Sequence, residues 1–240
     1  MKKKNQFLNI KGAVLDNEQL GIYMEKAASS HDLVLKSNMS TYPIPRLKEN
    51  LEFIGRTYNL LNTHVERRID IYPAGEWLLD NFYAIEETVQ MVVKELSPKR
   101  YKGLPGLAIS GYSRIYSLAV EIVAHTDGRV TEEVLNWAII SYQKRKALNM
   151  EEIWNLLLFL NIATVENIRS ICERIYSSQI QKYKVESILE RLVEGKADKE
   201  QKFKFVEAEF ISARAEIHAT STSRHSPQPN ALPVYRIYVV

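Results

Sequence analysis

The feature that most constrains the fold is a stripe of apolar residues spaced alternately four and three positions apart. Its members are Leu47, Leu51, Ile54, Tyr58, Leu61 and Val65. This spacing places one apolar face on a helix that reaches about Asp70. A coiled coil would give the same stripe, but Gly55 and the short length of the repeat favour a core helix of a bundle.

Further helical segments flank this stripe. They are expected over about 16–28, 73–96, 112–126, 131–146, 149–176 and 179–194. Asp16 with Gln19 resembles a capping pair at a helix start. Asn149 with Glu152 forms a second pair of this kind. Glycine and proline mark residues 99–111 as an ordered loop. Because no β-period segment occurs before residue 200, we predict an all-α, multi-helix bundle of about seven helices.

Composition divides the chain into three parts. Hydrophobic residues make up 45% and charged residues 25% of the 240 positions, which is enough for a sizeable core. We expect a flexible N-terminus over residues 1–14 and a helical domain over 15–196. The segment 205–240 is rich in Ser, Thr, His, Pro and Asn, and we expect a disordered, low-order tail because such a sequence buries little apolar surface.

Charge, cysteine content and hydropathy exclude several classes. The 32 basic and 29 acidic residues give a net charge of +3, and no nucleic-acid motif accompanies the basic start of the chain. The most apolar stretch, 153–163, is shorter than the ~20 residues that span a bilayer, so no membrane span is predicted in this chain. The single cysteine, Cys172, has no partner for an internal disulfide, which suits a cytoplasmic location.

Five unusual motifs occur in order between Pro73 and Arg169. They are PAGEWLLDNFYAIEE (73–87), LP (104–105) with GYSRIY (111–116), AHTDG (124–128), EIW (152–154) and VENIR (165–169). In this order and at these separations they resemble the N-terminal region of the cyclic β-1,2-glucan synthetases. Those proteins are very large, multidomain, membrane-associated glycosyltransferases. The resemblance covers about residues 32–202.

The resemblance implies a segment that precedes the catalytic domains of a parent enzyme, which makes β-1,2-glucan from a sugar nucleotide at the cytoplasmic membrane. We therefore expect a non-catalytic scaffold whose partners are the downstream catalytic domains, with no catalytic, cofactor-binding or metal residues in this chain. The alternative is a stand-alone helical module that binds a protein or β-1,2-glucan. Beyond residue 209 the resemblance ends, as a premature stop, a frame change or a fragmentary gene model would produce.

Three tyrosines beside the glycine- and proline-rich stretch are the candidates for a glycan or domain-contact surface. They are Tyr101, Tyr112 and Tyr116. The three tryptophans, Trp77, Trp137 and Trp154, occupy apolar helical positions and are predicted to lie in the core.

A second set of residues is predicted to form a structural polar network. Its members are Asp80, Asn81, Glu86, Arg114, His125 and Asp127. The carboxylates would pair with Arg114 and fix how the helix of Trp77 meets the helix after Tyr112. His125 and Asp127 stand at a helix end, where we expect them to satisfy backbone groups rather than bind a metal.

Overall fold

The computed structural model describes residues 12–193. For residues 182, 183 and 186–193 of the last helix it describes the backbone and not the side chains. The predicted tail at 205–240 and most of the predicted flexible N-terminus lie outside the described residues. The elements, in chain order, are α1 (Asn17–Ser30), β1 (Leu33–Val34), η1 (Met39–Thr41), α2 (Ile44–Glu66), α3 (Pro73–Glu95), α4 (Pro98–Gly103), β2 (Gly106–Leu107), α5 (Arg114–His125), α6 (Glu132–Gln143) and α7 (Met150–Val193). The all-α prediction of about seven helices is confirmed.

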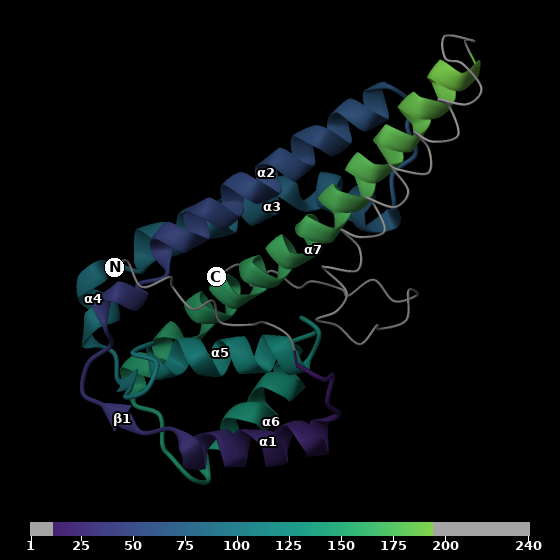
Figure 1. Ribbon diagram of the computed structural model, residues 1–240. Helices are drawn as coiled ribbons and strands as arrows, with labels where there is room; N and C mark the ends of the chain where they lie inside the picture. The colour runs from purple at the N-terminus through teal and green to yellow at the C-terminus, as the bar shows by residue number, and fades with distance from the viewer. Residues whose placement is uncertain (1–11, 194–240) are drawn as a thin grey trace.

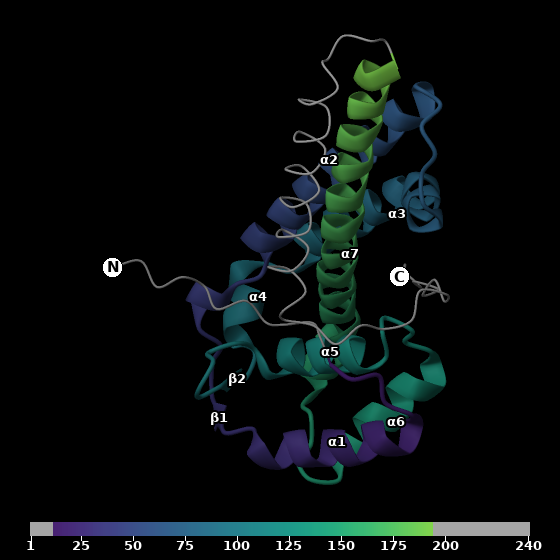
Figure 2. The same cartoon turned by 45° about the vertical axis from the view of Figure 1, so that its right-hand side comes forward.

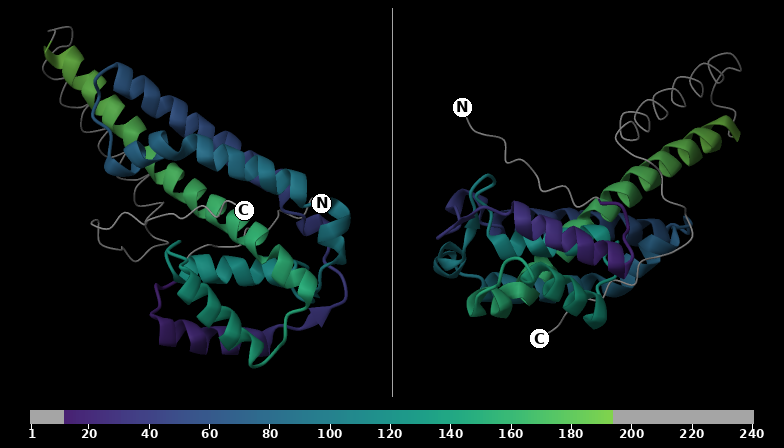
Figure 3. Two further views of the ribbon diagram at one scale, coloured as in Figure 1. Left: turned by 180° about the vertical axis from the view of Figure 1, so that it is seen from behind. Right: turned by 90° about the horizontal axis from the view of Figure 1, so that it is seen from below.

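The helices form two groups that share α7 (Figure 1). The long helices α2 and α3 lie along α7 and make a long-helix bundle with it. The short helices α1, α5 and α6 make a short-helix layer at the start of α7, where α5 packs against α7 and α1 against α6. Figures 2 and 3 show the same division from other sides, with the C-terminal part of α7 projecting beyond its neighbours.

Both predicted capping pairs are present. The amide of Gln19 donates to Asp16 Oδ1 at 2.8 Å, and the Gln19 side chain accepts from the Asp16 amide. The amide of Glu152 donates to Asn149 Oδ1 at 2.8 Å, and Glu152 Oε2 accepts from the Asn149 amide at 2.9 Å. Each pair satisfies two backbone donors at a helix start and so fixes where α1 and α7 begin.

Two of the predicted boundaries were wrong. The expected loop 99–111 contains α4, because Pro98 suits the first turn and the Ser97 hydroxyl caps it by accepting from the Arg100 amide. The same stretch contains β2, which pairs antiparallel with β1. The two helices expected on either side of residues 177–178 are one, because Ser177 bonds the Glu173 carbonyl within the helix and no glycine or proline interrupts it.

The apolar stripe of α2 is buried on a slightly rotated face. Leu47, Ile54 and Leu61 are buried, whereas Val65 at the end of the stripe is half exposed. The buried face also carries Asn50, Thr57 and His64, spaced seven apart. This rotation places polar groups on the face of α2 that packs against α7, where His64 contacts Gln179.

The core is densest where the two groups meet on α7. Every residue from 158 to 166 is buried, which a helix shows only when neighbours cover all its sides. None of the described helices combines the length and the apolarity that crossing a membrane requires.

Candidate functional site

The three tyrosines expected at a surface lie mostly inside the protein. Tyr101 and Tyr116 are buried and Tyr112 is half-buried, so this prediction was wrong for the first two. The Tyr101 hydroxyl lies 2.8 Å from the Thr41 hydroxyl and accepts from the amide of Ser113 at 3.2 Å. Tyr101 therefore fastens α4 to the chain before α2 and the chain before α5, because burial obliges its polar end to find partners.

Arg114 forms a buried ion pair with Glu152, whereas the predicted polar network joined Arg114 to carboxylates of the Trp77 helix. Its Nε donates to Glu152 Oε1 at 2.6 Å, and its Nη2 donates to Oε2. Both side chains are almost completely buried. Asp80 is exposed and Glu86 is only partly buried, so neither reaches Arg114. The network therefore joins α5 to the start of α7 rather than to α3.

Further polar contacts connect the buried ion pair to α6 and to the end of α1. Tyr142 lies beside Arg114, and burial raises the pKa of the Tyr142 hydroxyl to about 12. The same hydroxyl lies 2.8 Å from Nδ1 of His31, while the Lys146 ammonium bonds the His31 carbonyl. Burial, with the nearby positive charges of Lys146 and Arg114, lowers the pKa of His31.

Of the other predicted members of the network, Asn81 and His125 contact backbone carbonyls and Asp127 ends a helix. Asn81 donates to the Trp77 carbonyl within α3. Nδ1 of His125 lies 2.8 Å from the Ala13 carbonyl and so ties the chain before α1 to the end of α5. Asp127 is exposed and, with Gly128, adopts a positive φ that ends α5, as a left-handed stop does.

A second arginine–carboxylate pair escaped the sequence analysis. Arg46 of α2 binds both carboxylate oxygens of Glu166, one of them at 2.9 Å, and Glu166 is 7% exposed. Two residues 120 positions apart carry no local signal that they meet. The one available hint was a carboxylate inside an otherwise apolar stretch of α7, since such a group needs a partner.

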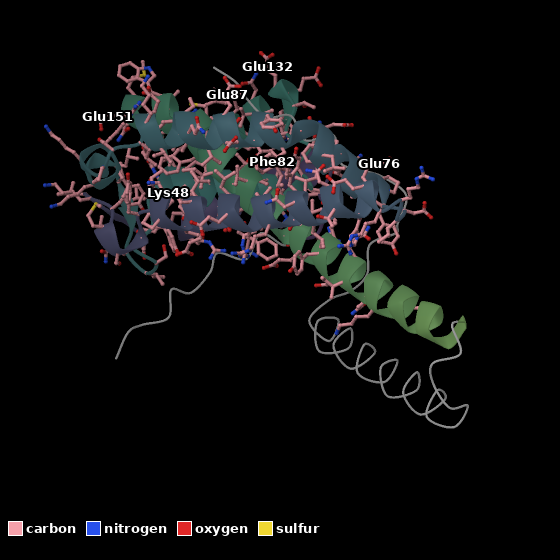
Figure 4. The ribbon with its side chains drawn as sticks, turned by 90° about the horizontal axis from the view of Figure 1, so that it is seen from above. Lys48, Glu76, Phe82, Glu87, Glu132 and Glu151 are labelled. Carbon is pink, nitrogen blue, oxygen red and sulfur yellow. The ribbon has the colours of Figure 1, made fainter. Side chains whose placement is uncertain are left out.

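An open cleft of about 450 Å³ separates α4 from the first turns of α7. Its lining consists of Ser97, Lys99, Arg100, Gly103, Glu151, Trp154 and Asn155. Figure 4 shows Glu151 at the end of the molecule away from the projecting part of α7.

Trp154 is the largest apolar side chain in this cleft and is 68% exposed, so its predicted place in the core was wrong. Trp137 is likewise 44% exposed, while Trp77 is partly buried against the core. The helical periodicity of the sequence could have indicated that Trp154 is exposed. With Asn155, Leu156 and Phe159 facing inward, position 154 falls on the outer face.

Asn155 forms the inner wall of the cleft. Its Nδ2 donates to the Glu151 carbonyl at 2.6 Å, and its Oδ1 is buried without a hydrogen-bond partner among the described residues. Within the same residues no group of three His, Cys, Asp or Glu side chains is placed to hold a metal ion. The Cys172 thiol is buried, which raises its pKa to about 12 and leaves it unsuited to nucleophilic attack.

Comparison with known proteins bears on the resemblance seen in the motifs. No family model matches the chain. Over 170 residues, 70% of its length, the chain is 32% identical to the cyclic beta-(1,2)-glucan synthase NdvB of Rhizobium meliloti (strain 1021). The predicted resemblance is confirmed. The chain spans about 6% of the length of that synthase.

Several residues of the motifs that resemble the glucan synthases lie in the interior. Arg114 of the motif GYSRIY pairs with Glu152 of EIW, and Glu166 of VENIR pairs with Arg46. Gly75 of the first motif faces Leu61, whose side chain would lie 3.1 Å from an added Cβ. These residues join α2, α3, α5 and α7, whereas Trp154 of EIW and several residues of the first motif are exposed.

Proposed function

We propose that this chain is a non-catalytic helical part of a cyclic β-1,2-glucan synthase-like glycosyltransferase and acts as a scaffold for its catalytic domains. The observation that carries the proposal is the 170-residue similarity to a synthase of which it represents about 6%. On this proposal the sugar-nucleotide chemistry and the handling of the glucan belong to other parts of the parent enzyme, at the cytoplasmic membrane.

The use of the reactive side chains supports a scaffold. Glu152 and Glu166 are the two most deeply buried carboxylates described, and arginines bind both. An arginine binds both oxygens of each carboxylate, so neither carboxylate is placed to contact a substrate. The one thiol is enclosed by apolar side chains.

The short-helix layer offers a surface that a neighbouring domain could contact. Helices α1 and α6 pack together and expose three large apolar side chains, Ile22, Trp137 and Ile140. Each is about half exposed or more. A scaffold needs such solvent-exposed apolar area, because burial of apolar surface drives most association between domains.

A segment exchange in the Rhizobium meliloti synthase tests the proposal. One variant lacks the matched segment, and a second carries residues 12–193 of this chain in its place. We expect the deletion to abolish cyclic glucan formation from the sugar nucleotide and the exchange to restore a measurable part of it. The exchange with Arg114→Met, which is expected to destabilise the fold, is the matched control and should restore less of it.

Two results would overturn the proposal. One is undiminished glucan synthesis by the deletion variant, which would show that the segment supports nothing. The other is glucan synthesis from a sugar nucleotide by the purified 240-residue chain alone, which would show that it is catalytic.

A further inference from the structure

We propose that the cleft between α4 and α7 binds a glucan chain, with the indole of Trp154 as the stacking surface. Trp154 leaves 68% of its area in solvent, although an indole gains more than almost any other side chain from burial. It stands in a cleft of about 450 Å³, within the range of small-ligand sites. The axial C–H groups of a β-linked glucose ring form an apolar face that suits an aromatic ring.

The polar groups around Trp154 match a neutral ligand rich in hydroxyls. Lys99 and Arg100 supply donors on the α4 side, and Glu151 supplies an acceptor on the α7 side. Sugar hydroxyls both donate and accept, so one ring can use both kinds of group. A carboxylate oxygen of Glu95 lies 3.6 Å from Nη1 of Arg100. This carboxylate and that of Glu151 counter the positive charge of Lys99 and Arg100, which disfavours a phosphate or another anion.

Asn155 bounds the inner side of the cleft. The side chain is 2% exposed, and its Nδ2 donates to the Glu151 carbonyl within α7. Its Oδ1 is out of reach of solvent, so the polar contacts of a ligand beside Trp154 come from the other residues that line the cleft.

The open side of the cleft leaves room for a chain rather than a single sugar. At Gly103 an added Cβ would meet nothing within 4 Å among the described residues, so this part of α4 leaves space opposite α7. The choice of β-1,2-linked glucose among carbohydrates rests on the proposed function. The stacking site itself rests on Trp154, the cleft and its charged lining residues.

Trp137 supplies a matched control within the same chain. It too is exposed beside an open cleft, between α1 and α6, whose other lining residues are Asn17, Glu18 and Glu133. Its indole is already engaged, because the Lys144 ammonium lies 5.8 Å from the ring centroid and the ring packs against Gly21. No buried amide oxygen lines that cleft.

The test is isothermal titration of the full 240-residue chain with linear and cyclic β-1,2-glucan, with cellohexaose as a β-1,4-linked comparison. We expect saturable binding of β-1,2-glucan that weakens about tenfold or more in Trp154→Ala and stays unchanged in Trp137→Ala. Trp154→Phe should keep part of the affinity. Circular dichroism of each variant should show an intact helical fold.

Each outcome decides the proposal. Absence of binding, or binding that Trp154→Ala leaves unchanged, overturns it. Equal binding of cellohexaose keeps the stacking site but overturns the assignment to β-1,2-glucan. The segment exchange measures synthesis rather than binding, so a scaffold without a glucan site would pass that experiment and fail this one.

Discussion

The helix α7 passes through two different surroundings within one chain. From residue 158 to 166 every position is buried, with Tyr101 and Tyr116 packed near Phe159 and Arg46 bound to Glu166. Further along, full burial recurs only every third or fourth position, at Ile168, Cys172, Ile175 and Gln179. The first stretch joins the two groups of helices, and the second contacts α2 of the long-helix bundle.

The difference in burial explains why one part of the α7 sequence is apolar on all sides and the later part is not. A helix covered on all sides needs apolar residues all round, so its sequence resembles a short membrane segment. Glu166 within the stretch is tolerated because Arg46 of α2 supplies a polar partner. The later part of α7 needs only one apolar stripe, and its outer face is polar.

The largest effect is expected from breaking the ion pair at the start of α7. Arg114→Met leaves Glu152 buried without its partner and should lower the free energy of unfolding by about 3–5 kcal/mol. The matched change Arg46→Met should cost less, about 1.5–3 kcal/mol, because Arg46 is 29% exposed and water can partly replace it. Urea denaturation followed by circular dichroism measures both.

The double replacement of Arg114 by Met and Glu152 by Leu sharpens this test. It removes both charges, so most of the lost stability should return. Equal losses in Arg114→Met and Arg46→Met would show that the exposure of the arginine does not decide the cost of breaking its ion pair.

Two aliphatic truncations on α7 compare the surroundings directly. Leu160→Ala creates a cavity where helices enclose the site on all sides, and we expect a cost of about 3–5 kcal/mol. Ile175→Ala lies on the single buried stripe, where neighbours can move into the space, and we expect about 2–3 kcal/mol. A larger loss for Ile175→Ala would reverse the comparison. The free energy of unfolding in urea is the measurement.

The buried face of α2 contains a group that the fold leaves unsatisfied. Both polar atoms of the Asn50 amide are buried without a hydrogen-bond partner among the described residues. Asn50→Leu should therefore raise the free energy of unfolding by about 1–2 kcal/mol, because it removes that penalty and adds apolar contact. The exposed Asn59 is the control, and Asn59→Leu should change stability by less than about 0.5 kcal/mol. A destabilising Asn50→Leu would show that the amide has an essential partner.

Local signals in the sequence predicted the helices well. The capping pairs at Asp16 and Asn149 gave the starts of α1 and α7, because both partners of each pair lie within one turn. The stripe from Leu47 gave the extent of α2 to within a few residues of its end at Glu66. The short helix α4 was missed because a glycine- and proline-containing stretch can still hold one capped turn.

The pairings between distant segments could not be predicted in the same way. Arg114 was expected to pair with carboxylates of the Trp77 helix, and Glu152 was not recognised as its partner, since its capping role already explained it. Trp154 was placed in the core because it stands among apolar helical positions, although its position relative to Leu156 and Phe159 put it on the outer face. Periodicity therefore deserved more weight than hydrophobicity at the helix start.

The smallest expected effect concerns His31, at the junction of α1 and α6. The pKa of His31 is lowered from 6.5, first by burial and then by the charges of Lys146 and Arg114. Below pH 6.5 the His31 imidazole therefore binds a proton in the unfolded chain but not in the folded chain. The free energy of unfolding then falls as the pH falls toward the folded pKa of His31. The unfolding free energy measured from about pH 5 to 7 should show this slope, flatter in His31→Gln. Tyr142→Phe should retain it because burial is the main cause, and an unchanged slope in His31→Gln would assign the effect to another group.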